Sequence, residues 1–386
     1  SAPLYVYPRL PRQKGERVNI SRPGALAALA TAAVLAMSSC AANESATPGS
    51  TSTASESSLS GTLTGIGASS AATAQETWVA AFQTKNPGVT VNYSPDGSGA
   101  GREAFAGGGA DFAGSDRAMK PEELTAEALA KSRCDASQGA LNLPIYISPI
   151  AIIYHVEGVT DLQLDADTLA GIFAGKITKW NDAKIAALNP DAKLPAQAIT
   201  PVHRADDSGT TQNLTEYLQA VAPSIWSYEP SGEWPVKGGE AAPQTSGMVD
   251  TVTNGTGTIG YADASKAGEL SVAKIKVGDT FADPTAESAA AIVDKSKRLT
   301  GEGRSANDWS IELDRKATGD VYPIVLLSYA IACQKYSDAG TAERVKAYLS
   351  YVASEAGQQD AVKTAKMAPL SAKLSTDVEA AAATIS

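Results

Sequence analysis

The order of hydrophobic and polar positions predicts alternating strands and helices from about residue 61 onward. Residues 61–69 read as a strand that ends in a glycine-rich turn, and residues 89–94 alternate apolar and polar positions like a half-buried strand. Between them, apolar residues recur on one helical face, and an Asn-Pro-Gly step at 86–88 ends that helix. A short helix at 102–107 and a short strand at 110–116 follow. This alternation favours an α/β layer with a mostly parallel sheet.

A second α/β set follows a long apolar run at 143–156. That run is rich in β-branched residues, which fits a buried strand or a strand that crosses between two domains. A strand, a loop and a helix are predicted across 198–221, and a turn and strand across 251–263. Strand character returns at 320–333, and residues 341–371 read as helical with a late proline stop. Two α/β lobes joined by crossing segments are the simplest arrangement.

The N-terminal residues carry the pattern of an export signal. Basic side chains are spread over residues 1–24, a short apolar run occupies 25–37, and small residues precede Cys40. The run is shorter than the roughly 20 apolar residues that a bilayer-spanning helix needs. We therefore expect a signal region at 1–39, with a possible N-terminal extension, and a Ser/Thr-rich flexible tether at 40–60. The folded part would then lie outside the cytoplasm.

Composition narrows the classes of partner. The chain of 386 residues has a formal net charge of −10, which disfavours nucleic acid and anionic membrane surfaces as partners. It has 2 histidines and 3 cysteines, with no HExxH or CxxC spacing, so neither a metal site nor a cofactor is expected. Outside the cytoplasm, Cys134 and Cys333 are more often paired than free, and we favour a disulfide over two separate buried thiols.

Four polar loops are candidates for a binding or catalytic site. They are residues 67–70, 97–101, 115–116 and 203–210. Three of them place glycine with serine or threonine just before a predicted helix, where unpaired backbone N–H groups and a partial positive charge attract anions. Any one such loop is equally consistent with ordinary helix capping. Three of them together, with a nearby arginine, favour an anion site.

The loop around Arg204 combines an arginine fork with a helix start near Ser208 or Gly209. A guanidinium group fits a tetrahedral oxyanion through two parallel hydrogen bonds. The alternative is a surface ion pair with Asp206 or Asp207. Both arrangements can hold together, because one aspartate can orient the arginine while the arginine faces a ligand.

From about residue 61 to its end, the sequence resembles the phosphate-binding proteins of bacterial phosphate ABC importers. The stretches "ADFAGSD", "GKITKWND" with "IAALNP", "HRADDSGTTQNLTEYL" and "GTIGYAD" occur in the order and at the spacing of that family. The resemblance implies an α/β, two-lobed periplasmic-binding-protein-like fold of type II, with the ligand in a cleft between hinged lobes. Residues 61–145 with 285–386 would form one lobe, and residues 146–284 the other. Cys40 resembles the lipidated cysteine of a lipobox, although Met37 is unusual there.

The resemblance also implies which residues contact phosphate. They are Ser69, Ser70, Ser98, Asp116, Arg204, Ser208, Gly209 and Thr210. Many family members have Thr-Phe at the first two positions, which matters little if a backbone N–H makes the contact. Asp206 would orient Arg204, and Asp207 would be solvated. Asp116 would accept a hydrogen bond from the O–H group that phosphate carries near neutral pH and that sulfate lacks.

The leading hypothesis is a lipid-anchored, extracytoplasmic binding protein. It would deliver inorganic phosphate to the permease and ATPase subunits of an ABC importer, act as a monomer without enzymatic activity, and touch the membrane only through its lipid. The alternative is a phosphate-ester hydrolase that uses Ser98 or Ser208, although Ser98 lacks the GxSxG elbow. A binding lobe adapted as a surface sensor or adhesin is a third possibility.

Overall fold

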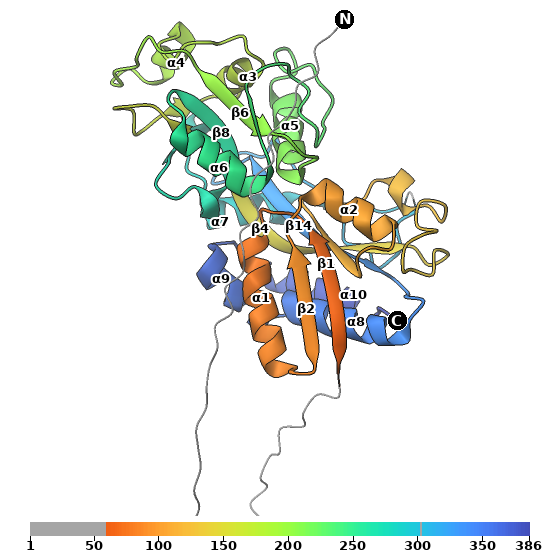
Figure 1. The fold of residues 1–386 in the computed structure, drawn as a ribbon. Coiled ribbons are helices and arrows are strands. Elements are labelled where there is room, and N and C mark those ends of the chain that lie inside the picture. The colour runs from red at the N-terminus through yellow and green to blue at the C-terminus, as the bar shows by residue number, and fades with distance from the viewer. Residues whose placement is uncertain (1–58, 302) are drawn as a thin grey trace, which may run out of the picture. The chain divides into compact units, whose positions relative to one another are not determined.

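In the computed structural model, residues 59–301 and 303–386 are described, and they form a mixed α/β fold (Figure 1). The predicted signal region, the lipidation site Cys40 and nearly all of the tether lie outside the described residues. Among the described helices, none combines the length and the apolar character needed to cross a bilayer.

The first strand group is built as the alternating pattern predicts. Its elements are β1 (Gly61–Gly67), α1 (Ala72–Lys85), β2 (Val89–Ser94), α2 (Ser98–Ala106) and β3 (Phe112–Ser115). β1 lies between β2 and β3 and pairs parallel with both. Helix α1 buries Trp78 and Phe82 on one face, in agreement with its predicted apolar stripe.

Two long strands, buried along almost their whole length, form the middle of the main sheet (Figure 1). They are β4 (Ala140–His155) and β14 (Val325–Cys333). β4 pairs antiparallel with β14 from Ala140 to Pro149, and then with β8 (Thr258–Asp263) from Ile150 to His155. β14 also runs antiparallel to β3. The prediction of a mostly parallel sheet is therefore wrong at its centre, because β14 returns the chain in the opposite direction.

The second strand group contains β8, β6 and β7. In chain order, the elements of this region before β8 are β5 (Gln163–Leu164), α3 (Ala166–Phe173), α4 (Ala183–Leu188), β6 (Thr200–Arg204), α5 (Gly209–Val221), β7 (Glu240–Ala242) and α6 (Gln244–Asn254). β6 pairs parallel with both β7 and β8. The sequence pattern misses α6, because only Thr245, Met248 and Val252 are buried and most of the other positions are polar.

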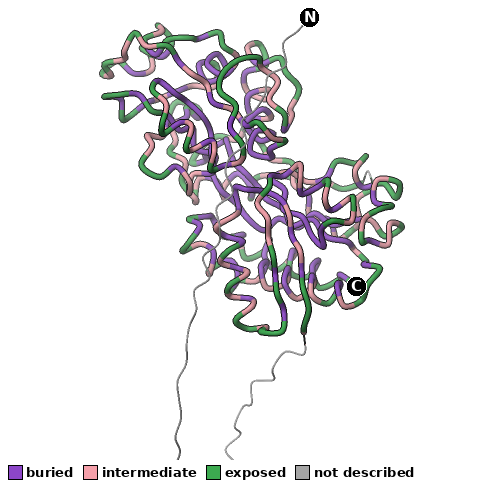
Figure 2. Tube along the Cα trace, viewed as in Figure 1, coloured by how far each residue is buried: buried purple, intermediate pink, exposed green. Residues whose placement is uncertain are grey.

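The remaining strands and helices complete the described chain. They are η1 (Pro121–Leu124), η2 (Ala264–Lys266), β9 (Ser271–Val272), β10 (Lys274–Val277), β11 (Thr280–Ala282), α7 (Ala286–Lys295), β12 (Lys297–Arg298), β13 (Ile311–Glu312), α8 (Ala339–Ala353), α9 (Glu355–Ala365) and α10 (Ala372–Ala382). Buried positions run along β4 and β14, while exposed positions gather on outer helices and loops (Figure 2). The predicted lobe boundaries at 145 and 284 stay a prediction; β4 itself changes its pairing partner after Pro149.

The predicted disulfide is confirmed. Cys134 and Cys333 are bonded across a sequence separation of 199 residues, with their Cα atoms 5.1 Å apart. The bond joins the segment before β4 to the last residue of β14.

Replacing both cysteines with alanine is expected to lower the free energy of unfolding by about 2–5 kcal/mol, because the unfolded chain gains entropy when so long a loop opens. Urea denaturation of the wild type and the double variant without reductant measures the difference. Adding reductant should shift the wild-type midpoint toward that of the variant and leave the variant unchanged. Equal midpoints without reductant would contradict this expectation.

Candidate functional site

Asp116 is the point where the four predicted loops meet. It follows β3 directly and is buried, and its carboxylate accepts hydrogen bonds from Ser70 Oγ at 2.8 and 2.9 Å and from Thr210 Oγ1 at 3.3 Å. Ser328 Oγ donates to the same carboxylate. The backbone N–H of Asp116 donates to Ser98 Oγ at 3.1 Å. The structure thus brings together residues that lie up to 212 positions apart in the chain.

The ionisation of Asp116 is set by opposing effects. Burial raises the pKa of its carboxyl group, because the charged form is removed from water. The hydroxyls of Ser328 and Ser70, the positive charge of Arg204 and the hydroxyl of Thr210 act in the opposite direction. The net shift of the pKa is upward. A carboxylate that is buried away from water needs each of these partners, because a buried charge without hydrogen bonds is unstable.

Arg204 ends strand β6 and is buried. Its Nε donates to Asp206 Oδ1 at 2.8 Å, its Nη2 contacts Asp206 Oδ2, and Nη2 also donates to Ser69 Oγ at 3.3 Å. Asp206 is held in turn by the backbone N–H of Gln244 at 3.0 Å. Burial alone would raise the pKa of Asp206, but its hydrogen bonds and ion pair with Arg204 lower it. The predicted contact between Asp206 and Arg204 is therefore present.

The N-terminus of α5 lies against Asp116. Ser208 is the N-cap residue, and its side chain accepts from the backbone N–H of Thr211 at 3.3 Å. A Cβ atom added at Gly209 would lie 2.4 Å from Asp116 Cβ and 2.7 Å from Ser98 Oγ, so this position has room only for glycine. The close approach brings the unpaired N–H groups of the first helical turn to the carboxylate side of the site.

Helix α2 starts earlier than the sequence predicts. It begins at Ser98 rather than at residue 102, so Ser98 lies in its first turn. The four residues Ser98–Gly101 include two glycines, which disfavour a helix by propensity, but tight packing requires them. A Cβ atom at Gly101 would lie 2.6 Å from Gly67 Cα. Tertiary packing therefore overrides the local preference.

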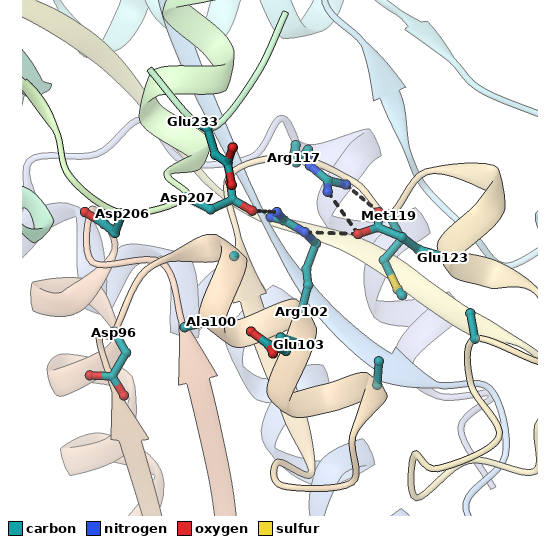
Figure 3. Close-up of a pocket in the computed structure, with 13 residues that line it drawn as sticks. Asp96, Ala100, Arg102, Glu103, Arg117, Met119, Glu123, Asp206, Asp207 and Glu233 are labelled. Atoms are coloured by element: carbon teal, nitrogen blue, oxygen red, sulfur yellow. Dashed lines mark hydrogen bonds and ion pairs between the residues drawn. The ribbon is translucent and has the colours of Figure 1, made fainter. Parts of the chain in front are cut away.

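A polar pocket of 470 Å³ adjoins the site (Figure 3). Asp207 Oδ2 accepts from Arg102 Nη2 at 2.8 Å, and the Asp207 carbonyl accepts from the N–H of Gly99 at 3.0 Å. Glu123 lies 3.4 Å from Arg102 Nε and also pairs with Arg117. The prediction that Asp207 is merely solvated is wrong: its side chain is 42% exposed, but it joins the second strand group to helix α2.

Sequence reasoning missed several buried polar residues around the site. Asn213 Nδ2 donates to the carbonyl of Asp116 at 2.6 Å and to that of Gly209 at 2.8 Å. Arg315 Nη2 contacts Asn213 Oδ1, and its Nη1 donates to the carbonyl of Val325 at 2.8 Å. Ser328 contacts Asp116 from β14. The sequence held two signals that could have indicated these residues: Ser328 is the single serine in an otherwise apolar strand, and Asn213 is a polar residue on the buried face of α5.

The geometry favours an anion clamp over a nucleophile. The ring of His203 stacks on Trp234 with centroids 5.3 Å apart, and its Nδ1 lies 3.0 Å from the carbonyl oxygen of Arg204. Ser98 Oγ contacts the backbone of Asp116 and Ser208 Oγ caps α5, so neither hydroxyl is paired with this imidazole. In residues 59–301 and 303–386, no cluster of acidic, histidine or cysteine side chains could hold a metal ion.

Comparisons with known proteins place the chain in a family. A family model described as a PBP superfamily domain matches residues 52–356. Phosphate-binding protein PstS 3 of Mycobacterium leprae is 38% identical over 338 residues, which cover 84% of this chain and 88% of that protein. The chain belongs to the PstS family of phosphate-binding proteins. PstS of Methanocaldococcus jannaschii is 30% identical over 296 residues, or 72% of this chain and 75% of that protein.

Solved structures share the fold. A phosphate-binding protein from Stenotrophomonas maltophilia superposes with a TM-score of 0.66 at 20% identity, covering 83% of this chain and 94% of that one. A second structure is that of a putative phosphate ABC transporter substrate-binding protein from Clostridium perfringens with bound phosphate. It superposes with a TM-score of 0.55 at 19% identity, covering 79% of this chain and 98% of that one. The PstS-family chain thus has the α/β, two-lobed periplasmic-binding-protein-like fold that its sequence predicts.

Proposed function

We propose that this PstS-family protein binds inorganic phosphate outside the cytoplasm and delivers it to an ABC permease. The observation that carries the proposal is one buried carboxylate, Asp116, which accepts from Ser70 and Thr210 of two other loops while its backbone N–H donates to Ser98 of a third. Isothermal titration calorimetry with phosphate, sulfate and arsenate tests it. Phosphate should bind and sulfate should not; a protein that binds neither would overturn the proposal.

Phosphate and sulfate differ at one atom that this site can detect. Arg204, the serine and threonine hydroxyls and the N–H groups that begin α5 all donate to oxygen. Asp116 is the acceptor among them, and it suits an oxyanion that still carries an O–H group. Sulfate would turn a lone pair toward the carboxylate and leave a buried acceptor without a donor. Sites built around a ligand O–H reject analogues that lack it by roughly 10⁴-fold.

The ion pair between Asp207 and Arg102 is proposed to slow the release of phosphate. Replacing Asp207 with asparagine should raise the dissociation rate constant by about 3- to 10-fold, a modest effect because the carboxylate is partly exposed. Stopped-flow displacement measures this rate.

Asp96 provides the matched control for that variant. It lines the same pocket, and its carboxylate accepts only from Ser94 Oγ among the described contacts, at 2.7 Å. Asp96→Asn removes the same charge without breaking an ion pair and should leave the rate unchanged. If the two variants release phosphate equally fast, general electrostatics rather than the ion pair is responsible.

The hydrolase alternative rests only on the presence of Ser98 and Ser208 near an anion site. Both hydroxyls are already engaged, and His203 stacks on an indole ring instead of activating either one. A chromogenic phosphate ester tests the alternative. Turnover that disappears in Ser208→Ala would contradict a binding-only role.

The lipid anchor, the permease and ATPase partners and the monomeric state remain parts of the proposal. Cys40 follows a short apolar run and small residues, and the tether behind it would reach roughly 25 Å from a membrane surface. Such a tether lets a monomeric binding protein sample the permease while it stays attached. Metabolic labelling of the wild type with palmitate tests the anchor; an unlabelled mature protein would remove it.

A further inference from the structure

Ser328 differs from the other hydroxyls that contact Asp116. Ser70 and Thr210 belong to the loops that are proposed to bind phosphate, and each can turn its hydroxyl toward a ligand. Ser328 instead lies within β14, is 1% exposed, and is not among the residues proposed to touch phosphate. Its Oγ donates to Asp116 Oδ1, which Ser70 Oγ also approaches at 2.8 Å, and Oδ2 accepts from Ser70 and Thr210.

The pairing of β14 with β4 is irregular at this residue. Ser328 pairs with Tyr146, but the next residue, Tyr329, pairs with Pro144, so Ile145 on β4 has no partner. An extra residue of this kind changes the twist of a strand pair and redirects nearby side chains. The irregularity therefore lies where a serine from the strand centre reaches the carboxylate at the end of β3.

We propose that Ser328 is a selectivity-positioning residue: it keeps its hydrogen bond to Asp116 Oδ1, and so supports the ionised carboxylate, when Ser70 and Thr210 turn their hydroxyls to the ligand and free Oδ2. The proposal rests on the proposed function, because it concerns how the same site separates phosphate from sulfate. Ser328 would act only through Asp116 and would not touch the bound anion.

Besides Ser328, few neighbouring charged groups influence the ionisation of Asp116. Arg204 at the end of β6 is the cation that favours its ionised form. Tyr93 on β2 faces it as a neutral phenol, because burial raises the pKa of that phenol well above its ordinary value. Asp206 and Arg117 are engaged with Arg204 and Glu123, respectively. Each hydroxyl that donates to Asp116 therefore makes a large contribution to offsetting the free-energy cost of burying the ionised carboxylate.

Loss of the Ser328 hydroxyl should raise the pKa of Asp116. A protonated Asp116 can donate a hydrogen bond, so the site would then accept sulfate, which carries no proton over the range of the experiment. Below the pKa of Asp116 sulfate should bind, and each pH unit above it should weaken sulfate binding about tenfold. The pH at which sulfate binding begins thus reports the ionisation of Asp116.

The experiment is a series of sulfate titrations from pH 4 to pH 8 on the wild type and Ser328→Ala, with folding checked by circular dichroism. In Ser328→Ala the sulfate profile should move up by about one pH unit, equivalent to about tenfold tighter sulfate binding at a fixed pH. Phosphate affinity at neutral pH should change much less. Ser328→Thr keeps a hydroxyl and should restore the wild-type profile.

Ser148→Ala is the matched control. Ser148 is also a buried serine, on the neighbouring strand β4, and its hydroxyl contacts the carbonyl of Pro149 at 3.4 Å rather than Asp116. A change in packing alone would affect both alanine variants, whereas the proposal predicts a shifted sulfate profile only in Ser328→Ala.

Two results would separate this inference from the proposed function. A wild type that does not bind phosphate overturns the function itself. A wild type that binds phosphate, together with a Ser328→Ala profile identical to it, overturns only the role of Ser328. If the alanine variant does not fold, Ser328→Cys provides a weaker donor of similar size and should shift the profile in the same direction. An unshifted profile in a folded Ser328→Cys protein also overturns the inference.

Discussion

Replacing Arg204 with alanine is expected to weaken phosphate binding by about 2–5 kcal/mol, or roughly 30- to 4000-fold in Kd. The variant loses charge-assisted hydrogen bonds to the anion and leaves the half-buried carboxylate of Asp206 without its cation. Calorimetry at moderate salt measures the change. Arg204→Lys should fall between the two proteins, because lysine keeps the charge but not the planar fork.

Arg298 offers a control for that experiment. Its guanidinium group lies 3.9 Å from the ring centroid of Trp309, and it donates to the backbone carbonyl of Asp308 at 2.8 Å. Arg298→Ala removes the same charge from the chain as a whole and should leave phosphate affinity nearly unchanged. Wild-type affinity in Arg204→Ala would remove Arg204 from the binding site.

Asp116→Asn is expected to change selectivity more than affinity. The side-chain amide can donate a hydrogen bond, so sulfate no longer faces an unpaired acceptor, and much of a rejection of roughly 10⁴-fold should disappear. Phosphate affinity should change modestly, because phosphate can present either an O–H group or a lone pair. Parallel titrations with both anions near neutral pH measure the ratio of their dissociation constants.

Asp263 is a second buried aspartate that serves as a control. Its carboxylate accepts from Tyr146 at 2.6 Å and from the backbone N–H of Ser265 at 2.9 Å, and neither residue contacts Asp116. Asp263→Asn should keep the wild-type selectivity even if the protein loses stability. If sulfate binding stays undetectable in a folded Asp116→Asn protein, the proposed role of Asp116 is wrong.

Local sequence patterns were sufficient to place most elements and the four loops of the site. The strand at β1, the helix of α1 and the start of α5 after Ser208 each depend on neighbouring residues, and the pattern of those residues predicted them. Resemblance to a family then indicated which side chains belong together, which no local pattern could do. The contact between Arg204 and Asp206 could be predicted from the sequence, because these residues are two positions apart.

What the sequence did not predict depends on contacts between distant segments. The direction of β14 follows from the path of the chain, and the early start of α2 from the packing of Gly101 on Gly67. Asp207 looked solvated because its partner, Arg102, lies 105 positions away. Ser328 looked like a small core residue, since its only informative neighbour is 212 positions earlier.

The disulfide has a consequence for how the protein withstands proteolysis. The chain from Cys134 to Cys333 includes the whole second strand group as well as all of β4 and β14. A protease that cuts one exposed loop between β4 and β14 would leave both fragments covalently linked, and the buried β4–β14 ladder would hold them in register. A singly nicked molecule would then remain one particle, and its two fragments would separate only after reduction and unfolding.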